Sequence, residues 1–216
     1  MKMLSTKTAI SCMVLASLVG SVNAQETANS TASVTIQNSF TLAESQALSF
    51  GTITVQGEQD TDATLDGTVQ AQVTVFANGS TPTSGSTGTT DTDAGDRDAS
   101  ATIITAGQPA IFDISGAAAF TTLTISVPAD DSVTLSAPSA PPTNGTFTIT
   151  GADLYDNANG TDIAVASDAG SITTDASGAA QFAFGAVLNT EDATGANTTS
   201  YIDETYTGSY SITVSY

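Results

Sequence analysis

The chain has 216 residues, of which 22 are acidic and three are basic, with no His, no Trp and one Cys. Beyond residue 24 the sequence contains no Lys, Cys or Met either, and Arg97 is its only basic side chain. This composition excludes Ser-His-Asp and Cys-His triads, Schiff-base lysines and His-ligated metal sites. It also lacks the positive surface that nucleic acids and anionic membranes require. The sequence therefore predicts a protein that is not an enzyme and does not bind nucleic acid.

The first segment, Met1–Ala24, has the pattern of a cleaved export signal. A basic start precedes an apolar run, and small residues follow up to Ala24. Signal peptidases read small residues at such positions, so we expect cleavage between Ala24 and Gln25. No later apolar run reaches the roughly 18–20 residues that span a bilayer. We expect an exported protein without a membrane span, located in the periplasm, at the cell surface or in the extracellular medium.

Short runs of alternating apolar and polar residues follow, separated by Gly, Asn, Asp and Ser. Alternation with period two, together with enrichment in Val, Ile, Thr and Phe, predicts strands with one buried face. A switch of parity at Gly51 predicts a β-bulge or a bend. The alternating rows are, in chain order, Val34 and Ile36; Leu48 and Phe50; Ile53 and Val55; Val69, Ala71, Val73 and Val75; Ala110, Phe112 and Ile114; Leu123, Ile125 and Val127; Val133 and Leu135; Phe147 and Ile149; Phe182, Phe184, Ala186 and Leu188; and Tyr210, Ile212, Val214 and Tyr216.

About ten such strands, with no helical periodicity, predict an all-β fold: an antiparallel, Ig-like β-sandwich that forms a single domain over residues 25–216. Residues 25–33 are polar and predict a flexible N-terminal extension. Residues 79–100, rich in Gly, Ser and Thr and then in Asp, predict one long, acidic, low-complexity loop. Residues 153–162 and 190–204 are expected to be polar loops. The side chains expected in the core are Phe50, Val73, Phe112, Ile125, Phe184 and Val214.

The densest acidic cluster is a candidate calcium site. Its carboxylates come from Asp91, Asp93, Asp96 and Asp98. Ca²⁺ takes about 6–8 oxygen ligands, and alternating Asp residues in a loop are a common source of them. The spacing lacks the Glu that closes an EF-hand loop, and a solvated loop of turn-forming Asp remains the alternative. Two further oxygen-rich segments, residues 62–67 and 153–162, allow the same two interpretations.

Four stretches resemble a family of exported bacterial proteins described as domain of unknown function 4402. The resemblance lies in the order of these stretches along the chain, and it implies no particular activity. The stretches are Leu48–Ile53, Pro109–Gly116, Thr124–Pro128 and Thr207–Tyr216.

The last of these stretches, Thr207–Tyr216, is also similar to the final strand of pilin-like subunits of chaperone–usher systems and of spore-coat-type secreted proteins. This resemblance implies subunits that polymerise when the N-terminal extension of one copy completes the open sheet of the next. Here Val34–Ile36 would be the donated strand. Two functions therefore remain open. One is a surface or extracellular structural component that associates with itself or with other exported subunits. The other is a secreted binding module whose acidic loops hold calcium or a carbohydrate.

A calcium titration tests the acidic cluster. If Asp91, Asp93, Asp96 and Asp98 bind Ca²⁺, an excess of about a hundredfold over Kd stabilises the fold by about 2.7 kcal/mol. Mg²⁺ at matched ionic strength controls for screening of the net charge. Replacing Asp93 and Asp96 by Asn should remove only the calcium-specific part of the rise in Tm. An equal rise with both salts would show that the cluster is a solvated loop.

Overall fold

The computed structural model describes residues 27, 31–34, 39–59, 68–90, 95–139, 141, 144–192 and 199–216. The chain forms two units, Met1–Gln37 and Asn38–Tyr216, and every strand of the described residues belongs to the second unit. The described residues contain no helix, and hence none long and apolar enough to cross a membrane. The predicted cleavage site between Ala24 and Gln25 lies outside them. The prediction of an all-β protein is confirmed for the described part of the chain.

The described residues form thirteen strands, all paired antiparallel. The strands are β1 (Thr41–Gln46), β2 (Thr52–Gln56), β3 (Thr68–Val75), β4 (Thr83–Thr89), β5 (Ser100–Thr105), β6 (Ala110–Ser115), β7 (Thr122–Ser126), β8 (Val133–Leu135), β9 (Phe147–Asp156), β10 (Thr161–Ile163), β11 (Ala169–Thr173), β12 (Ala180–Thr190) and β13 (Thr213–Ser215).

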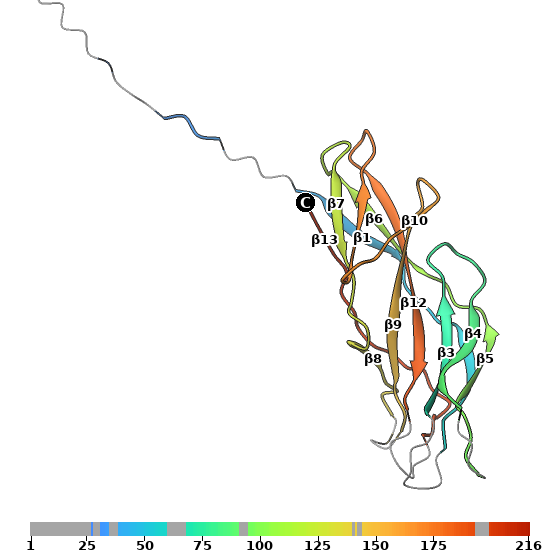
Figure 1. Cartoon of the computed structure of the whole chain (residues 1–216). Coiled ribbons are helices and arrows are strands. Elements are labelled where there is room, and N and C mark those ends of the chain that lie inside the picture. The colour runs from blue at the N-terminus through green and yellow to red at the C-terminus, as the bar shows by residue number, and fades with distance from the viewer. Residues whose placement is uncertain are drawn as a thin grey trace, which may run out of the picture. The chain divides into compact units, whose positions relative to one another are not determined.

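The strands form three sheets, which Figure 1 shows as ribbons. The largest has eight strands, in the order β1-β6-β12-β3-β4, with β9 also paired to β12 and with β8 and β10 paired to β9. The second sheet has the order β11-β7-β13, and the third consists of β2 and β5. Strand β12 lies at the centre of the largest sheet because it pairs with β3, β6 and β9.

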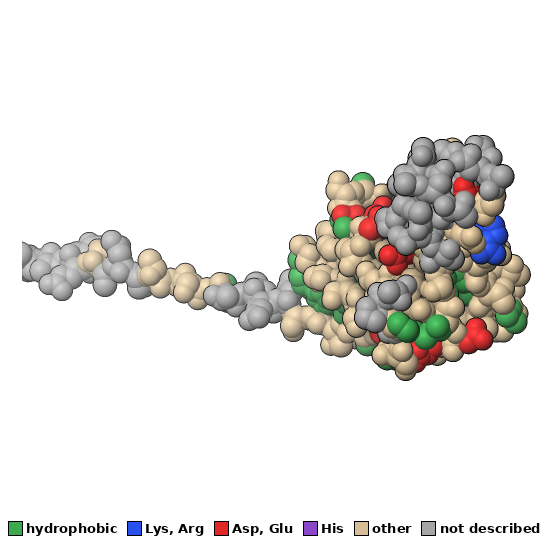
Figure 2. Space-filling view, turned by 90° about the horizontal axis from the view of Figure 1, so that it is seen from below, with side chains coloured by type: hydrophobic (Ala, Val, Ile, Leu, Met, Phe, Trp, Pro, Cys, Tyr) green, Lys and Arg blue, Asp and Glu red, His purple; other side chains and the backbone are tan. Residues whose placement is uncertain are grey.

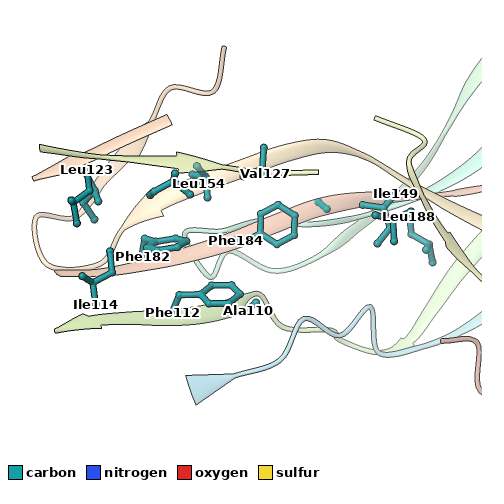
Figure 3. Packing of buried hydrophobic residues seen from close by; sticks show 14 of the residues in the cluster. Ala110, Phe112, Ile114, Leu123, Val127, Ile149, Leu154, Phe182, Phe184 and Leu188 are labelled. Atoms are coloured by element: carbon teal, nitrogen blue, oxygen red, sulfur yellow. The ribbon is translucent and has the colours of Figure 1, made fainter. Parts of the chain in front are cut away.

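The eight-stranded and three-stranded sheets bury their apolar faces in one common core. Phe182 of β12 pairs with Phe112 of β6, and their rings stack with centroids 5.3 Å apart. Figure 3 shows both rings among the buried side chains of the core. Leu123 and Ile125 of β7 belong to the same core cluster and are fully buried. The alternation of apolar residues therefore brings side chains from separate sheets into contact without any disulfide.

Four of the six side chains expected in the core are confirmed as buried: Val73, Phe112, Ile125 and Phe184. The other two, Phe50 and Val214, pack against the core but are half-buried. Phe50 lines an open cleft described below, and Val214 lies on β13, a short strand with a pairing partner on one side only.

Two segments expected to be loops contain strands. Within residues 79–100, β4 pairs with β3 over its whole length; in 153–162, the end of β9 and β10 form a hairpin. The prediction for residues 79–100 was wrong because low hydrophobicity argues against burial, whereas a strand at the margin of a sheet needs only backbone hydrogen bonds to its neighbour. The prediction for residues 153–162 was wrong because its many polar residues outweighed Leu154, which is fully buried in the core. Within residues 190–204, the described residues after Thr190 form no strand.

The predicted irregularity at Gly51 is present. Gly51 has φ of +82°, and the register between β2 and β5 shifts between Thr52 and Ile53. A Cβ atom at this position would overlap the main-chain oxygen of Thr105. Only glycine combines this backbone conformation with so close a neighbour.

Truncation of a core ring tests the fold. Phe182→Ala should lower the free energy of unfolding by about 3–5 kcal/mol, because the ring is fully buried and its neighbours cannot fill the cavity. Phe182→Leu, which keeps more of the volume, should cost less. Phe120→Ala is the matched control, because that ring is 73 % exposed. Equal losses for Phe182→Ala and Phe120→Ala in urea denaturation would contradict the assignment of the core.

Candidate binding cleft

A cleft of about 780 Å³ opens where the two-stranded sheet and the C-terminal segment meet the eight-stranded sheet. Phe50, Ile53 and Val55 line it from β2 and the residues before that strand, and all three are half-buried. Phe147 of β9 and Leu188 of β12 line it from the large sheet. The lining is therefore continuous with the protein core, but part of it is open to solvent.

The C-terminal segment, residues 199–212, borders this cleft without forming a strand. Its only β-bridge within the described residues joins Thr207 to Ser136. Aromatic contacts hold it instead. Tyr201 stacks on Phe147 at 4.6 Å between centroids, and Tyr206 meets Phe147 edge-on at 4.9 Å. Side-chain packing takes the place of a backbone ladder along this border of the fold.

The phenol groups of this segment also hold the chain through hydrogen bonds. Tyr201 Oη accepts a hydrogen bond from the backbone N–H of Glu191 at 2.9 Å and donates one to the carbonyl of Thr146 at 3.2 Å. Tyr206 Oη accepts from the backbone N–H of Ile202 at 3.0 Å. These tyrosines are therefore structural side chains with one edge facing the cleft.

Burial at the cleft changes the acidity of two phenols. It raises the pKa of Tyr210 to about 12, an effect to which the charge of Glu44 adds. Burial also raises the pKa of Tyr201 well above its usual value, and the charge of Glu191 contributes to this rise. The cleft is thus an environment that disfavours charge and suits an apolar occupant.

The rim of the cleft is polar, whereas its lining is apolar. Ser49 and Thr52 lie on one side, and Asp203, Glu204 and Thr205 lie on the other. An elongated segment of peptide, with apolar residues on one face and polar residues on the other, has the matching pattern. The side chains that line the cleft include no nucleophile paired with a His or Lys base, since neither type occurs there.

The predicted calcium ligands are only partly within the described residues. Asp91 and Asp93 lie outside them, and Asp96 and Asp98 are half-buried. Between these two, Arg97 donates from its guanidinium to Gln59 Oε1. In the described part of the chain, no group of three or more Asp or Glu side chains is placed to hold a metal ion. The calcium site at Asp91, Asp93, Asp96 and Asp98 therefore remains a prediction.

The oxygen-rich segment 153–162 uses its carboxylates in local structure. Asp156 is buried, and its Oδ1 accepts from the backbone N–H groups of Ala158 and Asn159 at 2.9 and 3.0 Å. Asp153 Oδ2 accepts from the backbone N–H of Ala77 at 2.9 Å. These bonds shape the β9–β10 turn and join β9 to the turn after β3. The third oxygen-rich segment, residues 62–67, lies outside the described residues.

A shallower hollow of about 580 Å³ contains further carboxylates, and these are also engaged locally. Asp113 accepts from Gln181 Nε2 at 2.6 Å, and hydrogen bonds from Gln181 and Ser45 lower its pKa. Asp175 accepts from the backbone N–H groups of Ala179 and Ser177, which lowers its pKa. Figure 2 shows, for one face of the molecule, that acidic side chains lie in several separate groups rather than in one patch.

Two features of this region were not predicted from the sequence. Tyr201 and Tyr206 fall in or just after a segment expected to be a polar loop, although three of the chain's five Tyr lie between residues 201 and 210. That concentration is a signal that could have indicated packing. Glu58 is 2 % exposed, and its Oε1 accepts from the backbone N–H of Val69 at 2.6 Å. Nothing in its local sequence distinguishes this carboxylate from exposed ones.

Comparison of the chain with protein-family models, with curated proteins and with solved structures finds no match.

The raised tyrosine pKa values predict a specific loss of stability in alkali. The pKa of Tyr210 is about 12 in the folded protein and about 10 when unfolded. The unfolded state therefore loses its proton first, and the free energy of unfolding falls as the pH rises from about 10 to 12. Below pH 10 this contribution is constant. Tyr210→Phe should make the decline shallower in denaturant titrations between pH 8 and 12, and an unchanged slope would contradict the burial of this phenol.

Proposed function

We propose that this chain is an exported, non-enzymatic β-sandwich protein with Ig-like topology, and that it acts as a pilin-like structural component of a cell surface or of the extracellular medium. The common core of the eight-stranded and three-stranded sheets supports the sandwich, because two sheets that bury apolar faces against each other form that architecture. The signal-like segment Met1–Ala24 and the resemblance to the domain of unknown function 4402 family support export.

The cleft is the observation that carries the proposal. In a complete sandwich, the C-terminal segment would contribute a long strand that closes the core. Here residues 199–212 border the cleft without a ladder, and half-buried apolar side chains such as Phe50 and Ile53 remain partly open to solvent. A strand from another copy, with apolar residues at alternate positions, would cover these side chains and lower the exposed apolar area.

The proposed occupant is the segment around Val34–Ile36 of a second copy. Val34 is 83 % exposed, and Ile36 lies outside the described residues. The two apolar residues are separated by Thr35, so in an extended chain both side chains point to the same face. Because residues 25–33 are polar, they suit a connection between copies better than a place in a core.

Two double variants, which add carboxylates to opposite faces of the segment around Val34–Ile36, distinguish this assembly from other contacts. The variant Val34→Asp with Ile36→Asp places two carboxylates on the face that enters the cleft, and it should be monomeric. The matched control, Thr35→Asp with Gln37→Asp, adds the same charge to the opposite face and should assemble like the wild type. Size-exclusion chromatography with light scattering, at fixed salt and protein concentration, measures the mass.

Two results would contradict the proposal. One is a wild-type protein that remains monomeric over the whole accessible concentration range. The other is an equal loss of assembly in both double variants, which would indicate repulsion between acidic molecules rather than insertion of one face. Unfolding curves of each variant show whether the monomer keeps its own fold.

A further inference from the structure

Strand β4 is fully exposed along its length, which sets it apart from its neighbours in the eight-stranded sheet. It consists of Thr, Ser and Gly, and each of its residues from Thr83 to Thr89 is exposed. It therefore gains almost nothing from the burial of apolar surface. Its ladder with β3 nevertheless runs from Thr83 to Thr89 without a shift in register. Backbone hydrogen bonds along one edge are what hold this strand.

The outer edge of β4 has no ladder partner within the described residues. In the sheet order, β4 pairs with β3 alone. Strand β5 approaches both β3 and β4 to within 8 Å between Cα atoms. Strand β5 forms its ladder with β2 and none with β4, so the described residues leave the backbone groups of that outer edge without a ladder.

This edge lacks the features that usually prevent pairing with another chain. Natural edge strands are protected by Lys, by inward-pointing charges, by Pro within the strand or by a bulge. Between Thr83 and Thr89 there is no charged residue, no Pro and no register shift. The whole hairpin, residues 68–90, has no charged side chain in a chain with 22 acidic residues. The side chains of this hairpin therefore add nothing to the repulsion between two acidic molecules.

We propose that the outer edge of β4 is a docking site for the β4 strand of a second copy. The two strands pair antiparallel about a two-fold axis at Ser86, the central residue of β4, which joins the two large sheets into one. In this register Thr83 lies opposite Thr89 of the second copy, and both glycines, Gly85 and Gly88, lie opposite hydroxyl residues. A glycine leaves room for the β-branched or hydroxyl side chain across from it.

The distribution of charge selects the antiparallel direction and this partner. The acidic run of the sequence begins at Asp91, two residues after β4 ends, whereas residues 77–82 before β4 contain no charge. Antiparallel pairing places the end of β4 that precedes the acidic run beside the uncharged start of the partner's β4. Parallel pairing would bring the two acidic ends together. The association is separate from insertion at the cleft, since it uses a different strand and a different edge.

Single-cysteine cross-linking tests the register. Ser86→Cys and Thr89→Cys are each introduced into the full chain together with Cys12→Ser, so every molecule has one thiol. Residues on the two-fold axis have Cα atoms about 4.5–5.5 Å apart, which a disulfide spans. Two Thr89 residues would be six positions apart along the ladder, or about 20 Å, which is too far. Ser86→Cys should give covalent dimers under mild oxidation, and Thr89→Cys should give at least tenfold fewer.

The two variants together decide the outcome. Equal yields would indicate random collision and would overturn the proposal, and so would the absence of dimers from both variants while the thiols remain reactive to a small alkylating reagent. The yield for Ser86→Cys should rise with NaCl concentration, because screening weakens the repulsion between acidic molecules. A yield that falls with salt would instead indicate that attraction between opposite charges drives the contact, and it would contradict pairing through this uncharged edge.

A second substitution separates this edge from the proposed structural function. In wild-type background, Ser86→Asp places two carboxylates opposite each other at the centre of the pair and should abolish the association. Ser171→Asp, at an exposed position of β11, is the matched control and should leave it unchanged. If Ser86→Asp has no effect while Val34→Asp with Ile36→Asp abolishes assembly, the edge proposal fails and the structural function stands. The reverse result would uphold the edge and reject the cleft.

Discussion

The fold depends on one constraint, which is that β12 must be buried on both faces and paired on both edges. Eight of its eleven residues are apolar or Gly, and neither a charged residue nor a proline interrupts it. Phe182, Ala183 and Phe184 are all buried, so the strand shows no alternation between core and solvent at its centre. The surrounding strands β3, β6 and β9 each pair with this strand, and this pairing sets their register in the sheet. The side chains that close the core from the three-stranded sheet then pack on the surface that these strands form together.

Alternation of apolar residues predicted most of the strands that lie against the core, but it missed β11, whose core side chain is Ile172 alone. Rows such as Val69–Val75 and Ala110–Ile114 became β3 and β6, because one buried face leaves a period of two in the sequence. The alternation of apolar residues did not predict the strands at the two ends of the large sheet, β1 and β4. Glu44 and Ser45 obscure β1, and β4 has no apolar residue at all. Such strands form because a neighbour offers unpaired backbone groups. For β1 this neighbour is β6, which is distant in the sequence, and for β4 it is the preceding strand, β3.

The cleft was less predictable than the strands. Its border is a segment without regular structure, held by ring contacts between Tyr201, Tyr206 and Phe147, and no local pattern encodes such contacts. The acidic clusters were candidate calcium sites because of their composition alone. Within the described residues, carboxylates such as those of Asp156 and Asp153 accept hydrogen bonds from backbone N–H groups in or near turns. The composition of a segment indicates which bonds its side chains can form, but the fold decides which partners are within reach.

The central place of β12 also governs the order in which the chain can fold. Its partners begin at residues 68, 110 and 147, whereas β12 itself begins only at residue 180. Until that part of the chain has been made, β3, β6 and β9 lack the strand between them, and the loops that must close to bring them together are long. The nascent chain therefore has little opportunity to form its core early. Such a delay leaves β3, β6 and β9 without their common partner until most of the chain has been made.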